Sequence, residues 1–175
     1  MKASGMRTIT SIVALATMAL SFCASAQAKE QVVTFSSSVG NVAPGDNFNV
    51  TVEYGVTDSN TSLNGLAMNV FFSSGDLEYV GSDGFLDIGD VMVEPKLSVD
   101  ARDLDGDPMT DMFISLAWVS FSKSWPGTAL PVSLAGLQFT VQEGAAGTVS
   151  LKPVIVESAA NYEARVNQLS IPVMK

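Results

Sequence analysis

The stretch D-N-F-N-V-T-V-E-Y-G-V, residues 46–56, decides the fold class. Every second residue in it is apolar, and polar or small residues stand between them. The apolar positions are Phe48, Val50, Val52, Tyr54 and Val56. Side chains of a β-strand alternate between two faces, so a period of two places these five side chains on one face of a sheet.

Strand patterns recur along the rest of the chain, whereas helix signals nearly vanish. Eight further strands are predicted, near Val33 and over 66–72, 77–80, 91–99, 112–121, 135–141, 148–156 and 166–173. The run 112–121 is apolar on both faces, which is typical of a central buried strand. About nine short strands separated by Gly- and Asp-containing turns predict an all-β fold, a nine-stranded jelly-roll β-sandwich.

Three prolines, Pro95, Pro153 and Pro172, fall inside predicted strands. Proline donates no backbone hydrogen bond, so these strands are predicted to lie at sheet edges or to carry bulges.

The first 28 residues have the pattern of a secretory signal peptide. Lys2 and Arg7 form a basic start, 9–23 is apolar, and A-S-A-Q-A supplies small residues for cleavage after Ala26 or Ala28. We therefore expect residues 29–175 to form a single exported domain with no membrane insertion after cleavage.

Charge and residue usage exclude several classes of function. Loss of Lys2 and Arg7 takes the formal net charge from −9 to −11, which argues against nucleic acid as a partner. The chain has no histidine, and its single cysteine, Cys23, lies in the predicted signal peptide. Disulfides, His- or Cys-based zinc sites and histidine-dependent nucleophiles are therefore excluded, and we do not expect an enzyme.

Three stretches in this order resemble cohesin-type modules: N-V-A-P-G-D-N-F-N-V-T-V (41–52), G-L-A-M-N-V-F-F-S-S-G-D-L-E-Y-V-G (65–81) and L-A-G-L-Q-F-T-V-Q-E-G-A-A-G-T-V-S-L (134–151). The resemblance implies a nine-stranded jelly-roll sandwich that binds a protein partner, dockerin-like or other, and that is related to carbohydrate-binding modules. The sequence departs from the family where residues 73–76, S-S-G-D, stand in place of the usual Tyr-Asp-Pro turn. With the signal peptide, the resemblance favours a bacterial protein that is secreted or periplasmic.

The stretch D-A-R-D-L-D-G-D-P-M-T-D, residues 100–111, is the candidate metal site. An EF-hand loop needs D-x-D-x-D-G and a glutamate at its twelfth position, and this stretch has no such glutamate. Asp103, Asp105, Asp107 and Asp111 are nevertheless candidate ligands for calcium, which prefers several carboxylate oxygens. The alternative is a solvated turn whose aspartates accept backbone N–H groups before the strand that begins at Met112.

The two tryptophans are the remaining candidates. Trp118 lies in the most apolar strand, so we expect it in the core. Trp125 precedes Pro126-Gly127 in a turn, and it either caps the sandwich or contacts a ligand.

The leading hypothesis is an exported, non-catalytic binding or scaffolding module that recognises a protein through a flat, partly apolar sheet face, with calcium as a candidate stabiliser. A carbohydrate-binding module is the first alternative, and it requires at least two coplanar exposed aromatic rings or a polar groove beside calcium, with polysaccharide as partner. The second alternative is a structural subunit of an extracellular matrix or appendage that assembles through unpaired strand edges.

Overall fold

A computed structural model of the protein describes residues 28–174. The predicted signal peptide lies outside the described residues, apart from Ala28. Nowhere in the described range does a helix occur that is long and apolar enough to cross a membrane.

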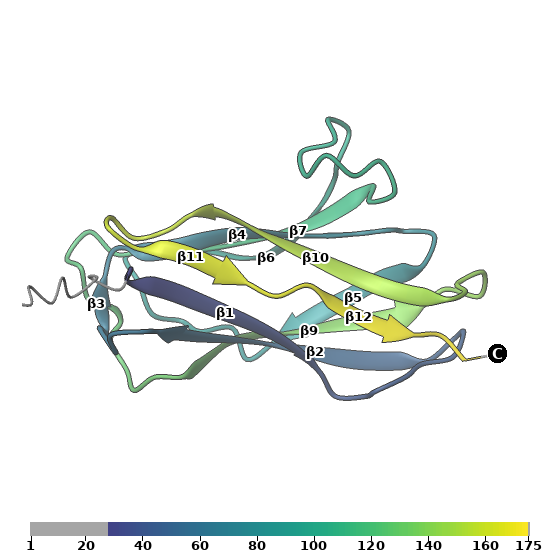
Figure 1. The fold of residues 1–175 in the computed structure, drawn as a ribbon, viewed down its shortest axis with the longest axis horizontal. Coiled ribbons are helices and arrows are strands. Elements are labelled where there is room, and N and C mark those ends of the chain that lie inside the picture. The colour runs from purple at the N-terminus through teal and green to yellow at the C-terminus, as the bar shows by residue number, and fades with distance from the viewer. Residues whose placement is uncertain (1–27, 175) are drawn as a thin grey trace, which may run out of the picture.

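Two five-stranded sheets face each other and form a sandwich (Figure 1). The first sheet has the order β11 (Glu163–Val166), β1 (Glu30–Ser37), β2 (Asn47–Val56), β9 (Val132–Val141) and β5 (Leu77–Asp83). The second has the order β12 (Leu169–Pro172), β10 (Thr148–Glu157), β4 (Gly65–Phe72), β7 (Met112–Val119) and β6 (Val91–Val99). A short ribbon of β3 (Ser62–Leu63) and β8 (Trp125–Pro126) lies at one end. Neighbouring strands are antiparallel except β1 and β11, and the all-β sandwich prediction is confirmed.

The core lies between the sheets and consists of the alternating apolar residues of the central strands. In β2, the strand predicted from residues 46–56, Phe48 to Tyr54 bury every second side chain. The predicted alternations in β4 and β9 are buried in the same way, including Phe72 and Phe139, whose rings meet edge to face at 5.6 Å. Period-two patterning therefore places the core correctly.

The described residues form twelve strands rather than the predicted nine. Two of the additional strands, β3 and β8, have only two residues each, too few for a period to be visible. The third arises because the predicted strand 166–173 is interrupted. Its first part belongs to β11 in the first sheet and its second part forms β12 in the second sheet.

Asn167 marks this crossing between β11 and β12. Its side-chain oxygen accepts from the Phe35 N–H at 2.7 Å, and its side-chain nitrogen donates to the Phe35 carbonyl at 3.0 Å. The amide thus extends the pairing of β1 with β11 by one step, after which the backbone is free to join β10 as β12.

The three prolines lie at positions where a strand needs no backbone N–H donor. Pro95 and Pro172 belong to the edge strands β6 and β12, and β6 has a bulge between Val93 and Lys96. Pro153 belongs to β10 beyond Leu151, where the pairing with β12 has ended. The edge-or-bulge prediction is confirmed for Pro95 and Pro172, and also for Pro153, because β10 carries a bulge between Ile155 and Glu157.

Candidate functional site

The outer face of the first sheet is polar. β2 turns Asn47, Asn49, Thr51 and Glu53 to solvent. Several of the polar groups pair with each other, for example Thr140 Oγ1, which donates to Asn47 Oδ1 at 2.6 Å. Such a surface is well hydrated and offers little apolar area to a partner.

The outer face of the second sheet is partly apolar. The strand register places Val93, Ala117 and Ala67 in one row across β6, β7 and β4, and Val91 and Val119 in the next. Val91, Val93 and Val119 are 49 %, 40 % and 37 % exposed. With Val154 of β10, these six residues form what we call the apolar face. The row next to Val154 is polar: Ser115 Oγ donates to Asn69 Oδ1 at 2.9 Å, and exposed Lys96 lies opposite Ser115 on β6. Glu157 lies opposite Ala67 at the β10 margin.

One end of this outer surface is covered by the loop that joins β6 to β7, residues 100–111, which stands out from the sandwich (Figure 1). Phe71 points outward from β4, opposite Lys152 and Phe113, yet it is only 1 % exposed and lies outside the main core cluster. Lys152 Nζ lies 3.1 Å from Asp105 Oδ2 and also donates to the Asp105 carbonyl at 3.2 Å. The acidic loop is therefore attached to the sheet beside Phe71.

The four aspartates predicted as a calcium set do not converge on one point. Asp100, Asp103 and Asp105 each place one oxygen within 4.8 Å of the others. Asp107 instead lies 3.7 Å from Lys152 Nζ. Asp111 accepts from Ser74, from its N–H at 2.7 Å and its hydroxyl at 2.6 Å. Calcium binding stays a prediction, and its geometric candidates are now Asp100, Asp103 and Asp105.

Several aspartates in the loop accept backbone N–H groups, as the solvated-turn alternative expects. Asp100 accepts from Leu104, Asp105 from Asp107, and Asp107 from Met109. Burial raises the pKa of Asp105, but hydrogen bonds from Lys152, Thr110 and the Asp107 N–H outweigh it and hold that pKa below its ordinary value. The hydrogen bond to Asp105 correspondingly raises the pKa of Lys152.

Replacing Lys152 with methionine is expected to lower the melting temperature at pH 7, because the Asp105 side chain, with no exposed surface, loses its ammonium partner. A carboxyl whose folded-state pKa is depressed stabilises the fold above its ordinary pKa, here 3.8, and this contribution disappears as the pH falls through the lowered value. Thermal melts of both proteins should therefore differ at pH 7 and converge toward about pH 3 and below.

Lys96→Met is the matched control, because Lys96 is exposed on β6 and makes no ion pair with any residue in 28–174. A gap between wild type and Lys152→Met that is the same at both pH values would contradict the assigned pairing.

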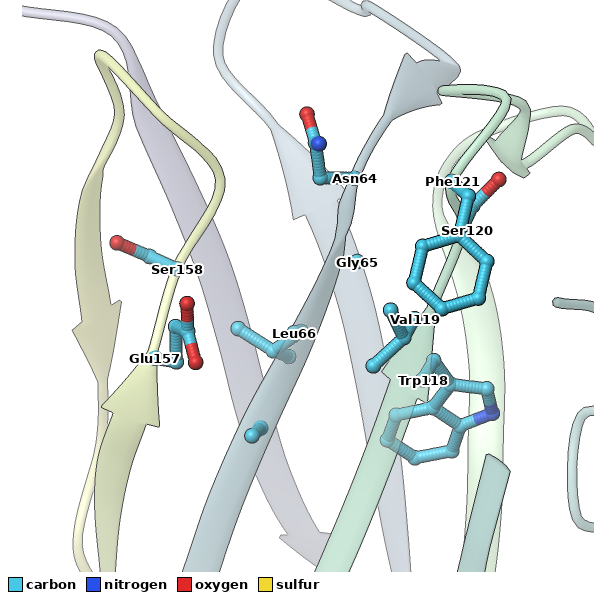
Figure 2. A pocket seen from close by; sticks show the side chains of 10 residues that line it. Asn64, Gly65, Leu66, Trp118, Val119, Ser120, Phe121, Glu157 and Ser158 are labelled. Carbon is cyan, nitrogen blue, oxygen red and sulfur yellow. The ribbon is translucent and has the colours of Figure 1, made fainter. Parts of the chain in front are cut away.

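At the opposite end of the apolar face lies a trough with a volume of about 270 Å³ (Figure 2). Its floor is the start of β4, where Gly65 and Ala67 leave the backbone nearly bare. Val119 and Phe121 stand on the β7 side, while Glu157 stands on the β10 side (Figure 2).

A buried glutamine fixes the floor and one wall of this trough relative to each other. Gln31 Nε2 donates to the Gly65 carbonyl at 3.0 Å and to Tyr54 Oη at 2.7 Å. Its side-chain oxygen accepts from the Ala159 N–H at 2.6 Å. The start of β4 and the segment after β10 are thus held by the same fully buried side chain.

Phe121 is the site residue that sequence reasoning missed. It was included in the apolar run 112–121, but β7 ends at Val119 and Phe121 is 75 % exposed. The turn that carries it is held closed: Asp90 accepts from the Phe121 N–H at 2.6 Å, and Ser120 Oγ accepts from the Ser124 N–H at 3.0 Å. The S-F-S-K-S composition was the available signal, since serines on both sides are typical of a hydrogen-bonded turn.

Both tryptophans belong to the core. Trp118 is buried as predicted, and its ring stacks on Phe85 at 5.0 Å. Trp125, 0 % exposed, lies 4.6 Å from the Tyr54 ring and 6.0 Å from that of Trp118. Of the two alternatives for Trp125, the cap of the sandwich matches this position, and its assignment as a ligand contact is corrected because the buried ring offers no face to a ligand.

Comparison with known proteins relates the chain to solved structures alone. No protein-family model matches it, and no curated protein does. The seventh ScaB type I cohesin of Pseudobacteroides cellulosolvens is similar with a TM-score of 0.54 and 13 % identity, over 83 % of this chain and 92 % of that chain. CaCohA2 of Clostridium acetobutylicum is similar with a TM-score of 0.55 and 18 % identity, over 82 % of this chain and 92 % of that chain. A chain of the Coh-OlpA–Doc918 complex of Clostridium thermocellum is similar with a TM-score of 0.53 and 13 % identity, over 83 % of this chain and 99 % of that chain.

The fold is therefore a cohesin-type jelly-roll sandwich, as the resemblance in sequence predicted. At 13–18 % identity this likeness concerns the fold, and function has to be argued from the surface.

Proposed function

We propose that the protein is an exported, non-catalytic module that binds a protein partner through the apolar face. The observation that carries the proposal is the contrast between the two outer sheet surfaces. One is lined by Asn, Thr and Glu, whereas the other carries a cluster of valine and alanine beside the polar row of Asn69, Ser115 and Lys96. A contiguous exposed apolar patch on a soluble protein is typical of a protein interface. Exposed Phe121 at its margin adds an aromatic anchor of the kind that dominates binding energy.

The solved relatives support a protein as the partner. The Coh-OlpA–Doc918 structure is described as a type I cohesin–dockerin complex, and the sixth cohesin of Acetivibrio cellulolyticus scaffoldin B was solved with a Cel5 dockerin. A dockerin-like protein is accordingly the first partner to test. Export rests on the predicted signal peptide.

Each alternative function is weaker on a specific observation. A sugar platform needs two coplanar exposed rings, and Phe121 is the only ring classed as exposed among residues 28–174. Assembly through the edges at β5 and β6 is disfavoured because β6 carries Pro95 and a bulge, and β5 has a bulge between Tyr79 and Gly81. Both devices protect an edge from further pairing.

The double change Val93→Glu with Ala117→Glu is expected to weaken partner binding at least about tenfold, because two carboxylates would be desolvated at the centre of the interface. Thr51→Glu on the polar face is the matched control and should bind as wild type does. Binding is measured by calorimetry with a purified type I dockerin. If this probe does not bind, proteins captured from the exported fraction by wild type are compared with those captured by the two variants.

The proposal fails if Thr51→Glu weakens binding as much as the double variant does. It also fails if wild type and the double variant retain the same proteins in the same amounts.

A further inference from the structure

The trough at the end of the apolar face has two chemically different walls. On the β7 side the wall is apolar, formed by Val119 and by the ring of Phe121, which a closed turn holds away from the core (Figure 2). On the β10 side stands Glu157, which Figure 2 shows on the other side of Leu66 from Val119 and Phe121, and which the strand register places opposite Ala67 of β4. Small residues on the floor leave room for a long side chain between the walls.

Glu157 has no cation of its own in the described part of the chain. The ion pairs there use Asp58, Asp105, Asp107 and Glu30, and none involves Glu157. The whole chain carries a net charge of −9, so a second carboxylate or a phosphate is a poor occupant of this space. A purely apolar occupant is also poor, because it would remove water from Glu157 without supplying a partner.

We propose that the trough is a subsite for a basic side chain, arginine above lysine, supplied by the partner protein. The aliphatic part of the basic side chain lies along Ala67 and Val119. Its cationic group pairs with the carboxylate of Glu157 and is attracted by the aromatic ring of Phe121. Long basic side chains combine an apolar stem with a charged end, as the two walls require. Arginine suits the site better, because its guanidinium is weakly hydrated, stacks on aromatic rings and pairs with a carboxylate through two hydrogen bonds. This inference rests on the proposed function, and it names the chemistry that the partner must present.

The probe is Nα-acetyl-arginine amide, titrated into the 15N-labelled protein and followed by NMR. Saturable shifts are expected at the amides of Ala67, Val119, Phe121 and Glu157, with a dissociation constant in the millimolar range, about what one anchored side chain provides. Nα-acetyl-citrulline amide has nearly the same shape without the charge, and it should shift these amides at least about tenfold less strongly at equal concentration.

Two variants test the contribution of each wall of the trough to binding of the probe. Glu157→Gln, at an exposed position, should keep the wild-type spectrum elsewhere and weaken the probe about tenfold, whereas Phe121→Ala should weaken it by a smaller factor. Glu53→Gln removes a carboxylate that is also exposed, but on the polar face, and should leave the titration unchanged.

The inference is overturned if citrulline and arginine shift the same amides equally, if Glu157→Gln binds the probe as wild type does, or if wild type shows no saturable shifts at these amides. The titration uses no partner, so its outcome is independent of the capture experiment. A bound probe together with an inert apolar face would reject the proposed function alone, and partner binding that survives Glu157→Gln would separate the trough from the interface.

Discussion

Replacing Trp118 with alanine is expected to lower the free energy of unfolding by about 3 to 5 kcal/mol, the usual cost of emptying the space of a large buried aromatic side chain. Trp118 lies in β7, between β4 and the edge strand β6, and its ring packs between Phe85 and Trp125, at ring distances of 5.0 and 6.0 Å. Trp125 does not move into the space that Trp118 leaves, because it is itself buried and in contact with Tyr54. For a domain of this size the melting temperature should fall by roughly 10 °C or more.

Phenylalanine substitutions of the two tryptophans separate packing from hydrogen bonding. Trp118 Nε1 donates to the Leu86 carbonyl at 2.8 Å, so Trp118→Phe leaves that carbonyl without its donor. Trp125 Nε1 is buried and has no hydrogen-bond partner among residues 28–174, so Trp125→Phe removes a donor that is unsatisfied there. Trp118→Phe should therefore be more destabilising than Trp125→Phe, by roughly 1 to 2 kcal/mol.

Chemical denaturation of the four proteins at one pH measures these differences. A larger loss for Trp125→Phe than for Trp118→Phe would contradict the hydrogen-bond assignment. A negligible loss for Trp118→Ala would contradict its place in the core.

The substitution Gly65→Ala is expected to cost about 3 kcal/mol or more, although it adds a single methyl group. Gly65 begins β4 with a φ of +129°, a conformation that residues with a side chain rarely adopt. A Cβ there would overlap the Trp118 carbonyl of the paired strand β7, and a backbone atom has no rotamer through which to move aside. The start of β4 would have to leave β7, and the floor of the trough would move with it.

Gly55→Ala is the matched control, because it makes the same chemical change within β2, where a Cβ meets no atom of the described residues within 4 Å. The control should unfold within about 0.5 kcal/mol of wild type, as expected for a substitution without strain. Similar losses in both variants would show that β4 tolerates displacement at Gly65 and would remove the steric argument for this glycine.

Sequence patterns were sufficient wherever one side of a strand is buried and the other is wet. The alternation from Phe48 to Tyr54 and that of β4 and β9 assign the inward residues correctly, since a period of two permits only one orientation toward a core. β7 shows the limit of this reasoning. Its residues are apolar on both sides, which predicted burial on both, but its outer side contributes Ala117 and exposed Val119 to the apolar face.

The candidate site depends on contacts between residues far apart in the chain. Asp111 was grouped with its neighbours as a metal ligand. In the structure, the N–H and hydroxyl of Ser74 donate hydrogen bonds to its carboxylate. Glu157 and Phe121 carry no shared motif, and they face the same trough only because β10, β4 and β7 lie side by side.

Local patterning thus specified the strands, their inward faces and the absence of histidine chemistry, because hydrophobic period and residue type are properties of each segment alone. The pairing order of the strands specified the rest. It determined which outer surface remains apolar and exposed, and it placed Trp125 beneath that surface rather than on it. It also placed Lys152 beside Asp105, because β10 and the loop between β6 and β7 come together only when the strands are arranged in one sheet.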